Sequence, residues 1–182
     1  MHYLLQFSRL IDGFSDLLMR GLRWVVVALI VLGVINVVGR YLGAQIGMQL
    51  SSNALLEAQT QAYNLIFLLA AAGLLARDGH IRVDILNVSL PQRLRLWIDI
   101  VGHALLLIPF CLLMLWFAWD YVMRAWSRLQ VSPHPDGLPL YPIKTVILIA
   151  FVLLLLQAVS EIIKRVDRLR RLAHGAGDGE AG

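Results

Sequence analysis

The chain has 182 residues, of which 59% are hydrophobic and 15% charged, and its formal net charge is +4. A mean hydropathy of +0.71 is far above that of a soluble domain and predicts an integral membrane protein. The length leaves no room for a folded catalytic domain beside several spans, so we expect no enzyme. The basic residues cluster at the ends of apolar runs, which indicates membrane topology and no nucleic-acid partner.

Residues 1–20 predict an amphipathic helix on the membrane surface. Their apolar side chains form one helical stripe, and the charged ones lie elsewhere around the helix. The stripe consists of Leu4, Phe7, Ile11, Phe14 and Leu18. A signal peptide would need a basic start and a small-residue cleavage site, which this pattern lacks, so we expect the segment to be retained.

Four apolar runs follow, each of about the length needed to cross a hydrocarbon layer of ~30 Å. They predict an all-α membrane protein with four transmembrane helices. The spans are expected at residues 21–42, 54–76, 94–119 and 142–163. A short helix on the membrane surface is expected between spans two and three, and residues 164–182 are expected to form a basic segment and then a disordered cytoplasmic tail.

The distribution of lysine and arginine predicts the orientation. Of the sixteen such residues, twelve flank the first span on its N-terminal side, join spans two and three, or follow span four. The other four are Arg40, Arg124, Arg128 and Lys144. The positive-inside rule therefore places both termini in the cytoplasm.

Polar side chains inside the spans need partners, because hydrocarbon offers no hydrogen bonds. Glu57 has two interpretations, a charge at the outer interface near a helix N-terminus or a contact to another helix or subunit. Asp99 and His103 share a helix face and predict a hydrogen-bonded pair, with a proton relay as the alternative. The amides of Asn36, Asn64 and Gln157 are expected to hold helices together.

The residue types argue against a cofactor or a metal. A haem held by two histidines needs both ligands within the spans, and His103 is the only histidine there. The same scarcity argues against a buried zinc site. Cys111 is the only cysteine, so an intramolecular disulfide is excluded.

Two stretches of the sequence resemble a known family, the DctQ-like small membrane subunit of tripartite ATP-independent periplasmic (TRAP) transporters. Span two opens with LLEAQ at residues 55–59 and is followed by HIRVD at residues 80–84. Span four is preceded by GLPLYPIK at residues 137–144 and contains Gln157 and Glu161. Together the two motifs are fairly specific, and the resemblance covers about residues 15–170.

The resemblance implies a complex in the bacterial inner membrane that takes up an organic acid by sodium symport. A periplasmic binding protein delivers the solute to a large multispan permease subunit, which carries the substrate and sodium sites. The small subunit is then a non-catalytic scaffold whose partners are the large subunit, the binding protein and membrane lipid. Structural or subunit-contact roles are expected for Glu57, Gln59, His80, Arg82, Asp84, Lys144 and Gln157.

Two other classes of protein stay open. One is the membrane anchor of a redox complex, which requires a bound haem or a redox partner. The other is a self-contained homodimeric small transporter, which would move its solute without a larger subunit.

Overall fold

The computed structural model describes residues 2–47, 52–77, 91–134 and 137–177 of the chain. The predicted all-α fold is confirmed, since four helical stretches of this part are long and apolar enough to cross a membrane. The helices are α1 (His2–Ile46), α2 (Asn53–Ala76), α4 (Gln92–Gly102), α5 (Ile108–Ser127) and α6 (Tyr141–Gly177). A π-helical turn, η1 (His103–Leu107), joins α4 to α5 within the third stretch.

Helix α1 unites the predicted surface helix and the first span. It has 45 residues, which correspond to about 68 Å of helix and exceed twice the hydrocarbon thickness. We expected two separate elements at this point. The sequence between them contains no proline, and Gly21, although glycine often follows a helix end, is tolerated inside this helix, which continues through it. Phe7 and Phe14 of the apolar stripe are exposed, whereas Ser8 and Ser15 are buried.

The third stretch changes its helical geometry just before Pro109. Proline has no backbone N–H and its ring clashes with the carbonyl four residues earlier, so the regular α-helical ladder cannot pass through it. The π-helical turn at His103–Leu107 is the local adjustment. The short surface helix expected before this stretch falls largely on residues 78–90, which lie outside the described residues.

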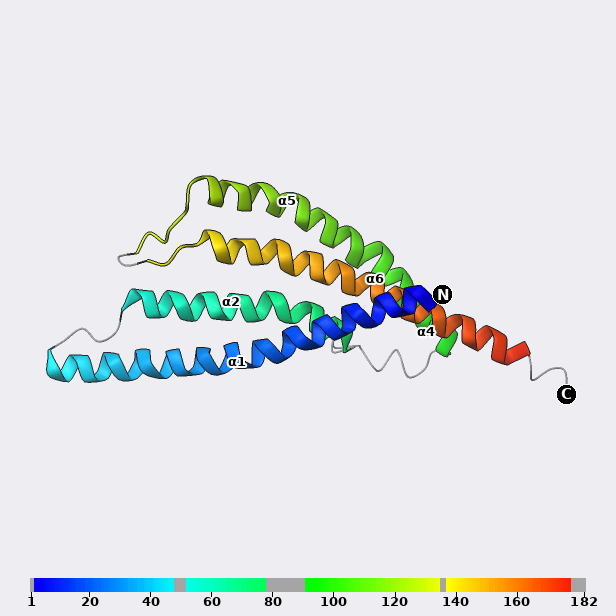
Figure 1. The fold of residues 1–182 in the computed structure, drawn as a ribbon, viewed down its shortest axis with the longest axis horizontal. Helices are drawn as coiled ribbons and strands as arrows, with labels where there is room; N and C mark the ends of the chain where they lie inside the picture. The colour runs from blue at the N-terminus through cyan, green and yellow to red at the C-terminus, as the bar shows by residue number, and fades with distance from the viewer. Residues whose placement is uncertain (1, 48–51, 78–90, 135–136, 178–182) are drawn as a thin grey trace.

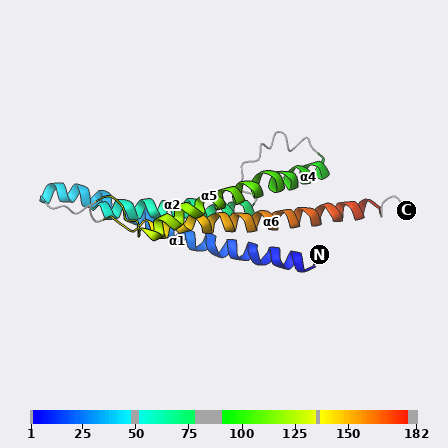
Figure 2. The ribbon, with the colours of Figure 1, turned by 90° about the horizontal axis from the view of Figure 1, so that it is seen from above.

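Helix α6 is the centre of the fold and contacts α1, α2, α4 and α5. Over much of their length α5, α6, α2 and α1 lie next to one another in a flat layer (Figure 1). Near the termini, α6 passes between α4 on one side and the start of α1 on the other (Figure 2). We term this region the terminus end, and the opposite one, where α5 leads into α6, the connection end.

The flat layer leaves wide apolar surfaces uncovered. In the most apolar 18-residue window of each membrane-crossing stretch, at most 33% of the residues are buried. Lipid or a partner chain has to cover the remainder.

Helices α1 and α2 pack along a regular seam. Buried or half-buried residues recur on α1 at alternating spacings of three and four, and apart from Gly33 every position between them is exposed. The seam consists of Leu22, Val25, Leu29, Leu32, Asn36, Gly39 and Gly43. This is the spacing of a left-handed coiled coil, and the small residues let two backbones approach closely.

Gly73 of α2 offers a test of this packing. A Cβ atom at this glycine would lie 2.6 Å from the sulfur of Met19 on α1. We expect Gly73→Leu to lower the free energy of unfolding by about 1–3 kcal/mol, because the added volume forces the two helices apart. Thermal unfolding in detergent measures this loss. Gly21→Leu is the matched control, since a Cβ atom there has no neighbour within 4 Å; equal melting temperatures for both variants would contradict the close packing.

Candidate functional site

The terminus end contains a group of buried and half-buried polar side chains from three helices, which we term the crossing cluster. Ser8 is 1% exposed, and both Gln157 and Ser160 are 0% exposed. Burial of so many polar groups is favourable only when they are paired. The cluster comprises Ser8, Asp12, Ser15, Asp99, Gln157, Ser160, Glu161, Lys164 and Arg165.

The cluster forms because two helices carry polar stripes that face each other. On α6 the polar residues follow Gln157 at positions i+3, i+4, i+7 and i+8, which lie on one helix face. On α1 they follow Ser8 at positions i+4 and i+7. The side of α1 that carries Ser8, Asp12 and Ser15 therefore faces α6, whereas Phe7 and Phe14 of the apolar stripe are exposed.

Gln157 connects α6 to α1 through both ends of its carboxamide. Its Nε2 donates to Oδ1 of Asp12 at 2.8 Å, and its Oε1 accepts a hydrogen bond from the Ser15 hydroxyl at 3.0 Å. The hydroxyl oxygens of Ser8 and Ser160 lie 2.6 Å apart. The amide thus binds two helices together, the role expected from its position inside an apolar helix.

Ion pairs complete the cluster and include α4. The Lys164 ammonium lies 3.1 Å from Oδ2 of Asp12 and also pairs with the Glu161 carboxylate. The Arg165 guanidinium, on a side chain only 4% exposed, pairs with Glu161 and lies 3.1 Å from Oδ2 of Asp99 on α4. Because a buried charge without a partner is costly, these pairs allow few relative positions of the three helices.

The predicted pair of Asp99 and His103 forms through the backbone. Nδ1 of His103 lies 2.6 Å from the carbonyl oxygen of Asp99, while the Asp99 carboxylate pairs with Arg165. The two partners in that ion pair are 66 residues apart in the sequence, so local spacing did not reveal them.

Sequence reasoning selected Gln157 and missed most of the cluster. The available signal was the polar spacing on α6, where Ser160, Glu161, Lys164 and Arg165 share the face of Gln157. For residues 1–20 we predicted a helix on the membrane surface and named no contact between its polar side chains and α6.

Glu57 lies near the connection end, where its carboxylate holds the segment between α5 and α6. It accepts a hydrogen bond from the Leu138 amide at 2.7 Å and another from the Ser132 hydroxyl. Backbone hydrogen bonds join the two arms of this segment, from Ser132 N to Leu138 O at 3.2 Å and from Leu140 N to Gln130 O at 2.9 Å. Glu57, the fifth residue of α2, therefore binds a connecting segment of its own chain, a partner that neither interpretation named.

Lys144 lies near the same segment. Its ammonium donates to Oε1 of Gln130 at 2.7 Å and lies 4.0 Å from the centre of the Tyr121 ring, a cation–π contact. The structure thus brings two of the predicted residues, Glu57 and Lys144, to one segment.

The other predicted site residues lie elsewhere or are not described. Gln59 lies against α1, where its Nε2 would be 2.8 Å from a Cβ atom at Gly33. His80, Arg82 and Asp84 lie outside the described residues, so their predicted roles are untested.

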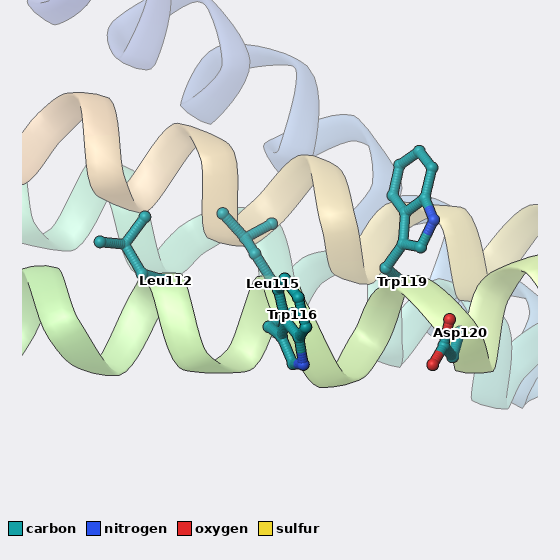
Figure 3. Close-up of a pocket in the computed structure, with 5 residues that line it drawn as sticks. All are labelled: Leu112, Leu115, Trp116, Trp119 and Asp120. Atoms are coloured by element: carbon teal, nitrogen blue, oxygen red, sulfur yellow. The ribbon is translucent and has the colours of Figure 1, made fainter.

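An open groove of about 440 Å³ runs along α5. The residues that line it all belong to this helix, and Figure 3 shows Trp119 near Asp120 and Trp116 farther along the helix beside Leu115. Trp116 is 79% exposed. Exposed tryptophans near one end of a membrane helix are typical of the interface with lipid headgroups.

Comparison with known families agrees with this architecture. Residues 29–168 match the family described as tripartite ATP-independent periplasmic transporters, DctQ component. The chain belongs to this family. No curated protein matches the sequence. The family match includes α2, α4, α5 and the α6 part of the crossing cluster, whereas Ser8, Asp12 and Ser15 precede it.

Arg165 provides a test of the crossing cluster in this DctQ component. We expect Arg165→Met to lower the free energy of unfolding by about 3–5 kcal/mol, because the Asp99 and Glu161 carboxylates lose the buried guanidinium and only Glu161 still pairs with Lys164. Denaturant unfolding in detergent measures the loss. Arg171→Met is the matched control on the same helix, since Arg171 is 75% exposed and pairs with Asp167 at 2.8 Å; its loss should not exceed about 1 kcal/mol. Equal losses of unfolding free energy in the two variants would show that the buried ion pairs of Arg165 stabilise the fold no more than the exposed pair of Arg171.

Glu57 provides a second test. We expect Glu57→Leu to release the segment between α5 and α6, because the Leu138 amide and the Ser132 hydroxyl lose their acceptor. Tryptic cleavage after the exposed Arg128 should accelerate by about tenfold or more, as expected when hydrogen bonds to a charged group are lost. Glu57→Gln, which keeps one acceptor oxygen, should show a smaller effect. An unchanged cleavage rate in Glu57→Leu would mean that other contacts hold the segment.

Proposed function

We propose that this chain is a non-catalytic scaffold that holds the large permease subunit of a TRAP transporter in the bilayer. Its family assigns it to the small permease component of such a transporter. In the proposal, the large subunit carries out sodium-coupled uptake of an organic acid, and a periplasmic binding protein delivers that acid.

The observation that carries the proposal is that the polar side chains within the helices bind other parts of the same chain. Gln157, Lys164 and Arg165 bind other helices of the same chain, and Glu57 binds the segment between α5 and α6. Helices α2 and α6 are continuous, whereas secondary transporters commonly hold ions and substrate at broken helices near the middle of the membrane. These features support a rigid layer with apolar faces, which suits a scaffold.

The proposed orientation places the terminus end in the cytoplasm of a bacterium and the connection end in the periplasm. Arg168, Arg170 and Arg171 on the last turns of α6 support it through the positive-inside rule. In this orientation Glu57 and Lys144 shape a periplasmic segment that is available to the binding protein. Gln59 and the segment with His80, Arg82 and Asp84 are proposed as further structural or subunit contacts.

Affinity purification of the tagged chain from its native membranes tests the proposal. In mild detergent, mass spectrometry should identify one large multispan permease in the bound fraction, because the proposed scaffold packs its uncovered faces against that subunit. Vesicles containing only this chain should accumulate no organic acid. Vesicles with both membrane subunits should accumulate it when the loaded binding protein and an inward sodium gradient are supplied.

Two results would contradict the scaffold proposal and favour one of the two other classes of protein. Uptake by the chain alone would identify a self-contained transporter. Recovery with a redox enzyme, together with a haem Soret band, would identify a redox anchor.

A further inference from the structure

One long face of α2 is exposed and polar at its centre. The exposed residues recur at spacings of three, four or seven, so they lie on one side of the helix. They are Leu56, Thr60, Tyr63, Asn64, Phe67 and Leu74. Asn64 is the twelfth of the 24 residues of α2, which places its carboxamide near the middle of a helix that crosses the membrane.

Asn64 has no hydrogen-bond partner within the described part of the chain. The nearby Thr60 differs, because its hydroxyl donates to the Leu56 carbonyl at 3.0 Å. Lipid tails neither donate nor accept hydrogen bonds, so an exposed carboxamide at this depth stays unsatisfied among lipids. A polar group of another polypeptide in the membrane can satisfy it.

A groove between α1 and α2 lies beside this face. It has a volume of about 470 Å³ and is lined by Gly33, Val34 and neighbouring residues of α1 and by Gln59 of α2. Gln59 and Tyr63 are four residues apart, so the groove adjoins the exposed face.

An unsatisfied amide oxygen lies close to this groove. Asn36 lies on α1 close to the groove residue Gly33 and is only 4% exposed, and its Oδ1 has no hydrogen-bond partner among the described residues. Unpaired buried polar atoms are rare in proteins. The middle of the α1–α2 pair thus carries unused hydrogen-bonding capacity both on its surface and beneath it.

We infer that the exposed face of α2 and the adjoining α1–α2 groove form the docking surface for a transmembrane helix of the large permease subunit, which presents a hydrogen-bonding side chain to Asn64. This inference rests on the proposed function. A transmembrane helix fits because it brings a polar side chain to mid-membrane depth while its own backbone groups stay paired. The members of this family are one component of a transporter with several components. We therefore assign the docking helix to the large membrane component.

The exposed face of α5 provides the contrast. Its middle is apolar, with Leu112, Leu113 and Phe117 each more than half exposed, and hydrocarbon tails can cover such a surface without loss of hydrogen bonds. Leu113 is therefore the matched control position for Asn64.

The first experiment removes the hydrogen-bonding atoms of the carboxamide and keeps a branched side chain with the same number of non-hydrogen atoms. The large subunit recovered with tagged Asn64→Leu should fall roughly three- to tenfold relative to the natural chain, as expected for one interhelical hydrogen bond in a membrane. Leu113→Ala should leave recovery unchanged. The melting temperature of Asn64→Leu without the large subunit should match that of the natural chain, because Asn64 binds no described residue of its own chain. Unchanged recovery with Asn64→Leu would overturn the docking surface.

The second experiment identifies the neighbour directly. A photo-crosslinking amino acid at position 64 should capture the large subunit, whereas the same group at position 113 should not. Capture at position 64 of lipid alone, or of a second copy of this chain, would overturn the inference.

The two proposals fail in different ways. If the natural chain recovers no large subunit, the proposed function fails and the docking surface with it. If the natural chain recovers the large subunit while the results at position 64 are negative, only the docking surface fails.

Discussion

Arg165 forms the interaction on which the arrangement of the helices depends. Its guanidinium pairs with Asp99 on α4 and Glu161 on α6, and the adjacent Lys164 pairs with Asp12 on α1. Between transmembrane helices apolar contact is weakly selective, because lipid tails are as apolar as leucine side chains. Buried charges are far more selective, since a small displacement leaves one of them unpaired. The ion pairs therefore determine how α1 and α4 meet α6.

The polar contacts stabilise the layer of helices near its two ends and leave its two faces open to lipid or to another subunit. Towards the termini the crossing cluster joins α1, α4 and α6, and near the connection end Glu57 holds the segment that joins α5 to α6. Between them α1 and α2 pack through the seam from Leu22 to Gly43. A layer held in this way keeps its shape while both of its faces remain open to lipid or to a second membrane subunit. This property suits the proposed role beside a large permease.

Sequence reasoning succeeded wherever a property was local. Runs of apolar residues predicted the four membrane helices, and the motifs around Glu57 and Lys144 led to the family. It was less successful with residues 1–20, because an amphipathic helix can place its polar side against water or against another polar helix with the same spacing. The structure shows the second arrangement, because Ser8, Asp12 and Ser15 contact polar side chains of α6. The predicted roles of His80, Arg82 and Asp84 remain predictions.

The sequence by itself determined the helical class, the number of spans and the polar stripe on α6, since each follows from the order of apolar and polar residues along the chain. Only the tertiary structure decided what the polar residues bind. Gln157 and Asp12 are separated by 145 positions, and Glu57 and Leu138 by 81, so no local pattern relates them. Hydrogen bonds and ion pairs act over a few ångströms in space, and folding brings such distant residues within that range.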